Sequence, residues 1–409
     1  MRIAFLASEF VTEREIDGGL AHSLHKTCLS LIKLGHQPFV IVSSKTDGVI
    51  FHNGIEVHRV KINGRPAGFL DFITLRQFTR SLAWLHQSRK LNREAEKLHR
   101  QKPLDIIVYA SHQAVGFFRF KKVPSVLRVN SHPRLWRTQD GKPHFSRDRK
   151  INVWLEITAA AKTDGLFAPS RVLAEIFRKE TEKPVAVIET PVTADVPRMD
   201  DRLYRNSLAG QDYLLFFGTM KRLKGVDVIA DILFELLEKY PRLIFVFIGG
   251  NTRYQPGMMM SDYLRQKAGP HHKRIIYFGQ MPHEQLYPVL DNALAIILPS
   301  RIDNLPNTCL ESMARKKVVV GTRGASFEQL IDDGINGFLC EPGNPADLLE
   351  TIKKVLALTP EQKEIIGEKA AQRVNAAEPE KTVAQLVNFF QKIIEKMNYN
   401  VKMLKDEIP

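Results

Sequence analysis

Asp303 and Glu311 lie eight residues apart in the stretch LPSRIDNLPNTCLESMARKKVVVGT, residues 298–322, where two carboxylates could contact the two ends of one ligand. The apolar run before them predicts a buried strand, and the segment after Pro306 predicts a helix. Proline suits the first turn of a helix because its missing N–H would have no partner there, and Asp303 or Asn304 can precede it as a capping residue. The pattern therefore places both acidic groups where a strand ends and a helix begins.

The beginning of this helix is suited to an anion. The N–H groups of Asn307, Thr308 and Cys309 should lack helical partners, and with the positive end of the helix dipole they could bind a diphosphate. Glu311 could accept hydrogen bonds from ribose hydroxyls, and Asp303 could reach a sugar hydroxyl beyond the phosphates. The alternative is that both carboxylates are solvated and that the Asn–Pro pair only caps the helix. The expected donor-binding residues here are Asn304, Leu305, Pro306, Asn307, Thr308 and Glu311.

A basic loop is the second candidate. The stretch FFGTMKRLKGVD, residues 216–227, places Gly218 and then Lys221, Arg222 and Lys224 after an apolar run. If a diphosphate binds at the start of the helix, fixed cations in this loop could stabilise its negative charge. An ordinary solvated basic run is the alternative.

The first half of the chain offers weaker candidates. In REIDGGLAHSLHK, Gly18 and Gly19 form a turn that could let the backbone approach a phosphate or sugar, although a tight strand–helix connection also explains two glycines. Polar side chains follow two further strand-like runs, in YASHQ and in SVLRVNSHP. Loop histidines with unrelated roles are the alternative there. The polar residues of these segments that could contact a ligand are His22, His112, Asn130 and His132.

These loops belong to two series of alternating strands and helices. Leu20, Leu24, Cys28, Leu31 and Ile32 recur at helical spacing between two β-rich runs, which predicts a strand–helix–strand unit. Each series predicts a doubly wound parallel sheet with helices on both faces. The predicted strands are 2–8, 37–44, 105–111, 125–131, 165–170 and 185–190 in the first series, and 213–218, 243–250, 274–279, 294–300 and 317–322 in the second.

A chain of 409 residues is too long for one compact core. Prolines and turn residues interrupt the periodicity near Pro191, so we expect one Rossmann-like domain over 1–190 and another over 191–380. A polar helix over 381–409 ends the chain and could pack back toward the first domain. Ligands of parallel sheets bind outside the carboxyl ends of the strands, so two facing sheets predict a cleft between the domains.

The charge is unevenly distributed. The formal net charge is +14, and residues 1–190 hold 31 lysines and arginines against 18 aspartates and glutamates. Phe78, Leu82, Leu85 and Leu91 sit at near-helical spacing among basic residues, which favours either a helix packed on its own sheet or one that rests on an anionic membrane. A nucleic-acid-binding protein is the alternative from another class. However, the basic residues do not alternate with aromatic ones, so no nucleic-acid partner is expected.

Other classes of protein lack support in the sequence. The three cysteines have neither zinc-ligand spacing nor a disulfide pattern. No apolar run approaches the ~20 residues that span a bilayer, and the beginning of the chain lacks a signal-peptide pattern. We therefore expect a cytoplasmic protein. The sequence also lacks GxGxxG after a strand, a Walker motif and an Asp-x-Asp triplet, which disfavours dehydrogenases, P-loop ATPases and metal-dependent transferases.

The stretch PSRIDNLPNTCLESMARKKVVVGTRGASFEQLIDDGINGFL resembles the signature of retaining glycosyltransferases of family 4, which have the GT-B fold of two facing Rossmann-like domains. The resemblance implies that Glu311 holds the nucleotide ribose and that Asp303, where the family more often has glutamate, contacts the transferred sugar. Lys224 matches the lysine that neutralises the diphosphate. Thr219 stands where the family usually has arginine, so Lys221 and Arg222 are the candidates to replace it. The residues that fill the pattern are Asp303, Glu311, Gly321, Gly324, Asp333, Gly334, Asn336 and Gly337.

The resemblance also implies roles outside this stretch. Gly19 would contact donor or acceptor, and Asn130 stands where many relatives carry a histidine, with His132 two residues on. The segment IIYFGQMPHEQLYPVLDNA resembles the stretch that lines the nucleotide base. The implied catalytic residues are Asp303, His132, Asn130 and Lys224, and the implied acceptor-binding residues are Gly18, His22 and His112.

The expected function is therefore a retaining, metal-independent glycosyltransferase without a cofactor. It would move a sugar from a nucleotide-diphosphate sugar to a glycan, lipid-linked or other hydroxyl acceptor in polysaccharide or glycoconjugate synthesis. The protein would be cytoplasmic, either free or peripherally bound to the inner face of a membrane. A sugar-nucleotide isomerase or epimerase of the same fold is the alternative within the enzymes.

Overall fold

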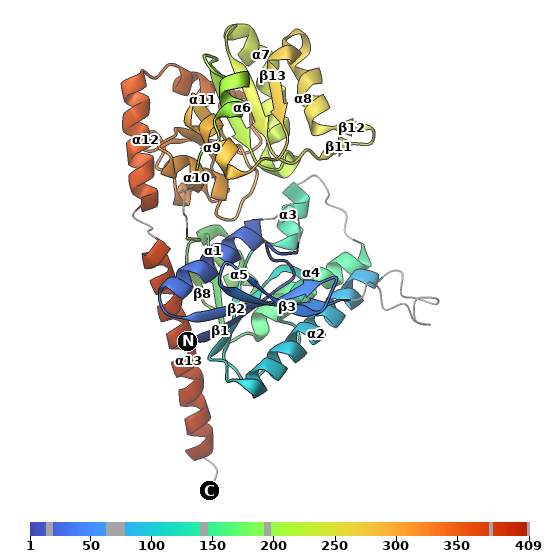
Figure 1. Ribbon diagram of the computed structural model, residues 1–409. Helices are drawn as coiled ribbons and strands as arrows, with labels where there is room; N and C mark the ends of the chain where they lie inside the picture. The colour runs from blue at the N-terminus through green and yellow to red at the C-terminus, as the bar shows by residue number, and fades with distance from the viewer. Residues whose placement is uncertain (14–18, 63–77, 140–145, 192–197, 376–378, 407–409) are drawn as a thin grey trace. The chain divides into compact units, whose positions relative to one another are not determined.

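The computed structural model describes residues 1–13, 19–62, 78–139, 146–191, 198–375 and 379–406. The chain forms two compact units, each a sheet flanked by helices (Figure 1). Unit 1 consists of Met1–Arg134, Pro143–Pro191 and Pro379–Pro409, and unit 2 consists of Leu135–Lys142 and Val192–Glu378.

Unit 1 is built on an eight-stranded sheet with the strand order β3-β4-β2-β1-β5-β6-β7-β8. All neighbouring strands are parallel except β3 and β4, which form a hairpin. The second and fifth strands flank β1 on opposite sides, so the winding direction of the chain reverses there and the loops that leave β1 and β5 diverge. The strands are β1 (Arg2–Ala7), β2 (Gln37–Ser44), β3 (Gly48–His52), β4 (Ile55–Lys61), β5 (Ile106–Ala110), β6 (Ser125–Arg128), β7 (Gly165–Ala168) and β8 (Val185–Val187).

The core of unit 1 joins distant parts of the chain. Ile3 and Phe5 of β1 are buried together with Leu386 and Phe390, which belong to the C-terminal helix. That helix therefore packs against the sheet of unit 1. The helices of this part are α1 (Gly19–Lys33), α2 (Thr79–Gln101), η3 (His112–Ala114), α4 (Arg147–Lys162), α5 (Arg171–Thr181) and α13 (Pro379–Asp406). The helix α3 (Pro133–Gln139) begins in unit 1 and continues into the segment assigned to unit 2.

The apolar residues expected to form a strip on α2 are not fully exposed to solvent. Leu91 is buried, and Phe78, Leu82 and Leu85 are half-buried. Ser88 and Asn92 are buried beside Leu91 and donate hydrogen bonds to the carbonyl oxygen of Val115. The helix is thus packed on its own unit by a face that contains polar residues, which favours the first of the two alternatives given above.

Unit 2 contains a six-stranded, entirely parallel sheet in the order β13-β10-β9-β14-β15-β16. Here β10 and β14 flank β9, so the winding reverses between β9 and β14. The strands are β9 (Tyr213–Phe217), β10 (Ile244–Ile248), β13 (Ile275–Phe278), β14 (Ala295–Ile297), β15 (Val319–Thr322) and β16 (Phe338–Cys340), and a small antiparallel pair consists of β11 (Arg253–Gln255) and β12 (Met258–Met259).

Helices cover the sheet of unit 2, and its strands are almost completely buried. The helices are α6 (Arg202–Ser207), η4 (Arg222–Lys224), α7 (Val226–Lys239), α8 (Met260–Ala268), η5 (Gly269–Arg274), α9 (His283–Asp291), α10 (Asn307–Ala314), η6 (Phe327–Gln329), α11 (Pro345–Leu356) and α12 (Pro360–Asn375). The predicted doubly wound α/β fold with two parallel sheets is confirmed. Among the described residues, the helices include none that combines the length and apolarity needed to cross a membrane.

Candidate active site

The candidate donor loops of unit 2 meet at the point where the winding reverses. Ala295 and Ile296 of β14 pair with Leu214 and Leu215 of β9, so the loops that leave these two strands are neighbours. Lys224, from the loop after β9, forms an ion pair with Asp303, from the loop after β14. Their side chains are 27% and 13% exposed, so the pair is reachable but shielded from bulk water.

Gly225 lets these two loops touch. Its φ is +69°, and a Cβ atom at this position would lie 1.8 Å from the carbonyl oxygen of Pro299. A side chain here would therefore push the loop that carries Lys224 away from β14. The backbone N–H of Arg301 donates to the carbonyl oxygen of Leu223 (2.9 Å), which joins the same two loops.

Asp303 is fixed by further polar contacts. Its carboxylate accepts hydrogen bonds from the backbone N–H of Asn304 (3.0 Å) and the hydroxyl of Ser300 (3.4 Å). The hydroxyl of Ser326 donates to the Asp303 carbonyl oxygen (3.0 Å). The carboxylate is therefore oriented by its own loop and by Lys224, and Ser326, the residue before η6, holds the backbone of Asp303.

The start of α10 differs from the prediction in two respects. Pro306 itself is the cap residue of α10, without a side-chain cap from Asp303. The N–H of Cys309, which the sequence suggested was free for a ligand, donates to the carbonyl oxygen of Pro306 (3.0 Å), so that part of the prediction is wrong. Asn307 and Thr308 precede the first intrahelical bonds, and their N–H groups remain the candidates for an anion.

Glu311 lies one turn inside α10 and is buried. Its carboxylate is 3.5 Å from Nε2 of His283, the first residue of α9. The sequence placed His283 only in the stretch that resembles a base-lining segment, and gave no sign that it faces Glu311. The contact makes His283 a further candidate beside the nucleotide.

The loop after β9 carries two further basic residues, Arg222 and Lys221. Arg222 lies 3.4 Å from the carboxylate of Asp227, which also pairs with Arg301 (2.5 Å). Lys221 is half-buried in the same loop. Lys224 is a cation that the fold brings to Asp303. Gly218 lies near the start of α10, because a Cβ atom on it would be 3.8 Å from the methyl group of Thr308.

Unit 1 brings two of its candidates to neighbouring loops. The hydroxyl of Ser8, after β1, is 3.0 Å from Nδ1 of His112, after β5. The backbone N–H of Asn130, after β6, donates to the hydroxyl of Ser111 (3.0 Å). His112 and Asn130 thus share the carboxyl edge of the sheet, where the winding of unit 1 reverses.

His132 is positioned differently from His112. It is buried against Phe177 of α5, and its Nε2 is 3.0 Å from the carboxylate of Glu180. These contacts attach its ring to α5. His22 is exposed on α1, and Gly19 is the first residue of that helix, whereas Gly18 lies outside the described residues.

A buried carboxylate supports the loop that carries His112. Glu156 of α4 accepts a hydrogen bond from the backbone N–H of Gln113 (2.9 Å), and burial raises the pKa of Glu156 to about 8. Gln113 and Ala114 both have positive φ angles, 61° and 51°, which non-glycine residues adopt at a cost. Glu156 was not anticipated, because nothing in a helical sequence marks which glutamate faces inward.

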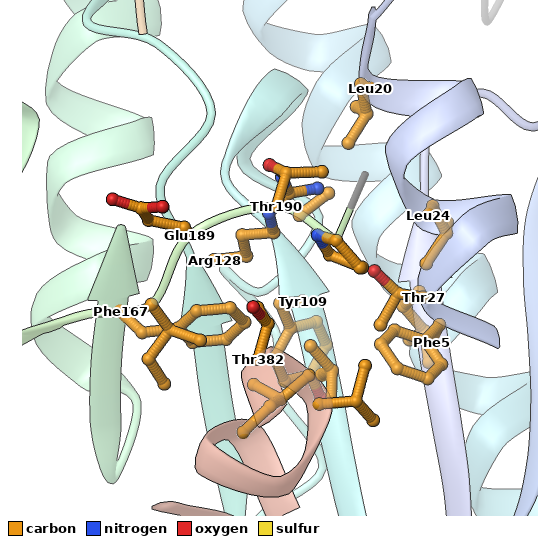
Figure 2. Close-up of a pocket in the computed structure, with 17 residues that line it drawn as sticks. Phe5, Leu20, Leu24, Thr27, Tyr109, Arg128, Phe167, Glu189, Thr190 and Thr382 are labelled. Carbon is orange, nitrogen blue, oxygen red and sulfur yellow. The ribbon is translucent and has the colours of Figure 1, made fainter. Parts of the chain in front are cut away.

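Arg128 is a second residue that sequence reasoning missed. It ends β6, and its guanidinium donates to the hydroxyls of Ser23 (2.5 Å) and Thr190 (3.0 Å). Arg128 lines a pocket in unit 1. Figure 2 shows it beside Thr190, with Phe5 and Phe167 among the side chains around this pocket. Burial lowers the pKa of Arg128 to about 10, so it stays charged near neutrality.

Two family models match the chain. The model described as glycosyl transferases group 1 matches residues 204–373, and the model described as glycosyl transferase 4-like domain matches residues 18–190.

Curated relatives are distant. An uncharacterized glycosyltransferase of Methanocaldococcus jannaschii is 26% identical over 142 residues, 35% of this chain and 37% of that protein. A D-inositol 3-phosphate glycosyltransferase of Corynebacterium jeikeium is 27% identical over 34% of each chain. The alignments with these two relatives thus cover about a third of their length. An alpha-D-kanosaminyltransferase of Streptomyces kanamyceticus is 25% identical over 71% of this chain and 76% of that protein.

Solved structures resemble the chain over almost its whole length. A sucrose-phosphate synthase from Thermosynechococcus elongatus has a TM-score of 0.74 at 17% identity, covering 97% of this chain and 99% of that one. The Anabaena protein HepE, in complex with UDP and glucose, has a TM-score of 0.68 at 16% identity, covering 96% of this chain and all of that one (100%). At these identities the likeness concerns the fold.

Proposed function

We propose that this chain, which belongs to the group 1 glycosyltransferases and has the GT-B fold, transfers a sugar from a nucleotide-diphosphate sugar to a hydroxyl acceptor. In this proposal the reaction retains the anomeric configuration and needs no metal ion. The observation that carries the proposal is the pairing of Lys224 with Asp303 beside the start of α10. A cation, a carboxylate and a helix N-terminus at the carboxyl edge of a parallel sheet suit a sugar diphosphate.

The geometry suggests how the donor binds in unit 2. The diphosphate takes the place of Asp303 as the partner of Lys224 and accepts hydrogen bonds from the N–H groups of Asn307 and Thr308. Asp303 then becomes available to a hydroxyl of the transferred sugar. Glu311 receives the ribose hydroxyls, and its burial strengthens those hydrogen bonds because water competes for them less.

In the proposed reaction the bond between the anomeric carbon and the diphosphate oxygen breaks, and a bond forms between that carbon and the acceptor oxygen on the same face. The acceptor proton passes to the leaving diphosphate oxygen, so the protein needs no strong base. Lys224 and the helix N-terminus stabilise the charge on the diphosphate as it leaves. No cofactor takes part. The lack of an Asp-x-Asp triplet in the sequence supports a reaction without metal.

The acceptor is proposed to bind unit 1 at the loops that carry His112 and Asn130. Either a glycan or a lipid-linked molecule fits this proposal. The excess of basic residues over 1–190 supports a cytoplasmic protein that rests peripherally on an anionic membrane, since each cation near such a surface contributes about 1 kcal/mol.

A screen of nucleotide sugars tests the donor. A nucleotide sugar that binds only the folded protein raises its melting temperature as concentration rises. The matching nucleoside diphosphate should then be released only when an acceptor is added, and turnover should survive chelation by EDTA. Conversion of the nucleotide sugar into an isomer without an acceptor would instead identify an isomerase, and activity restored only by manganese would contradict the metal-free reaction.

A further inference from the structure

A second pocket lies in unit 1 at the amino ends of β7 and β8, the edge opposite the loops of His112 and Asn130. Its volume is about 590 Å³, within the size range of small-molecule sites. Donor and acceptor sites of parallel sheets lie at the carboxyl edge, so this pocket is not part of the proposed transfer site. Its lining includes Arg119, Lys162, Asp164, Lys183, Lys396 and a set of apolar residues on the sheet and on α13.

The pocket has an excess of positive charge. Arg119, Lys162, Lys183 and Lys396 come from four separate segments of the chain. Asp164 is the one carboxylate among the lining residues, and Arg119 already pairs with it at 3.0 Å. Within the described part of the chain, none of the three lysines has a carboxylate at ion-pair distance.

Two of the lysines of the pocket make further contacts. The ammonium group of Lys183 donates to the carbonyl oxygen of Thr163 (2.7 Å), and that of Lys162 lies 3.8 Å from the centre of the Phe117 ring. The pKa values of both lysines are lowered, first by burial and also by neighbouring cations, which include Arg119 in each case, while Asp164 partly opposes this effect on the pKa of Lys183. Bringing these cations together costs free energy that a bound anion would offset.

The rest of the lining is apolar and lies partly on α13. Leu166 and Val185 line the pocket from β7 and β8, and Phe389, Ile393 and Met397 line it from α13. The helix packs closely on the sheet here, because a Cβ atom on Gly165 would lie 2.8 Å from the side chain of Ile393. A ligand in this pocket would therefore contact both the sheet and the helix.

We propose that this pocket binds a phosphate-bearing molecule with an apolar portion, separate from the substrates of sugar transfer. The phosphate lies among Lys162, Lys183 and Lys396, and the apolar portion lies against α13. Such a ligand would clamp α13 to the sheet of unit 1. The phosphate can belong to a free metabolite or to a lipid headgroup. Trp154, which is 58% exposed, packs against the same Phe117 ring that Lys162 contacts and is suited to the lipid source.

Lysine acylation followed by mass spectrometry tests the proposal, because it identifies the lysines that a ligand protects. Protection in this pocket is thereby distinguished from phosphate binding at Lys224. Octyl phosphate is the soluble probe, and phosphatidylcholine vesicles with or without phosphatidic acid are the lipid probe. The expected result is protection of Lys183 and Lys396 from acylation by octyl phosphate. Protection by the phosphatidic acid vesicles as well identifies a lipid headgroup, and protection by octyl phosphate alone identifies a soluble ligand.

Charge reversal on α13 gives a matched pair of variants. Lys396→Glu should weaken octyl phosphate binding at least about tenfold, because a charge-assisted contact is replaced by repulsion. Lys392→Glu makes the same change one turn earlier on the exposed surface of α13, outside the lining, and should bind like the wild type. Both positions are exposed, so both variants should fold. Absence of protection by either probe at saturating concentration, or equal weakening in the two variants, would overturn the proposal.

Discussion

Lys224 and Asp303 are 79 residues apart in the chain and form an ion pair between the loops that leave β9 and β14. Each charge is the other's partner in this structure. In the proposed reaction a donor diphosphate replaces the carboxylate at Lys224, and the displaced carboxylate then becomes available to the sugar. This exchange makes distinct predictions for the two residues and for the residues that support them.

Asp303→Asn should separate nucleotide binding from catalysis. The amide keeps the shape of the side chain but removes the charge that competes for Lys224, so a nucleoside diphosphate should bind as tightly as to the wild type or more tightly. Turnover should fall by roughly 10²-fold or more, because the contact to the sugar is weakened where charge develops. Calorimetry and initial rates measure the two effects. Asp262→Asn, at an exposed position of α8, is the control, and equal loss of nucleotide and nucleotide-sugar binding would contradict the assignment.

Glu311→Ala should abolish measurable nucleotide binding. Two charge-assisted hydrogen bonds to ribose are worth roughly 1.5–3 kcal/mol each, which corresponds to a loss of more than 10²-fold in affinity. His283→Gln should have a smaller effect on the same titration, since His283 is more exposed and its contact to Glu311 is long at 3.5 Å. Glu364→Ala, on the exposed surface of α12, is the control. Unchanged binding in Glu311→Ala would show that the ribose lies elsewhere.

The sequence predicted the parallel strands well, because strands covered on both faces are continuous apolar runs. It did not lead to the hairpin of β3 and β4, although Asn53 and Gly54 are a typical two-residue turn and have positive φ angles of 50° and 79°. The order of the strands within each sheet could not be predicted from the sequence either. Asp303 and Lys224 could be named from their loops, but their pairing follows from β14 lying beside β9 in the sheet. The same holds for Glu311 and His283, whose contact depends on how α9 and α10 pack.

Glu156 predicts a pH dependence of stability. Its pKa in the folded protein is raised by burial to about 8, so its contribution to stability is complete below the ordinary carboxyl pKa and is lost as pH rises toward 8. Glu156→Gln keeps the acceptor oxygen for the Gln113 N–H and should stabilise the protein at pH ~8 by roughly 1–4 kcal/mol, with a much smaller gain near pH ~5. Denaturant titrations at both pH values measure this. Glu175→Gln, exposed on α5, should change neither value, and a gain independent of pH would contradict the assignment.

Binding to membranes should depend on charge and salt. If the basic first half rests on an anionic surface, the protein should sediment with vesicles that contain phosphatidylglycerol and remain in the supernatant with phosphatidylcholine alone. Sedimentation should fade as salt rises from ~0.05 to ~0.5 M, because the attraction is screened. Equal recovery in the supernatant with both vesicles at low salt would favour an acceptor that is not held at a membrane.

Gly225→Ala should disconnect the two loops of the candidate active site. Its Cβ would lie 1.8 Å from the carbonyl oxygen of Pro299, so the loop must move and the pairing of Lys224 with Asp303 must be lost or distorted. Gly210→Ala is the matched control, because Gly210 has a similar φ of +74° but nothing within 4 Å of an added Cβ. The control should lose about 1 kcal/mol of stability from the left-handed backbone and keep its activity. Gly225→Ala should lose more stability and nearly all turnover, measured by thermal unfolding and by donor consumption. If the two alanine variants had equal stability and equal turnover, only the strain of the left-handed backbone would account for their loss of stability. The contact between the loops would then not support catalysis.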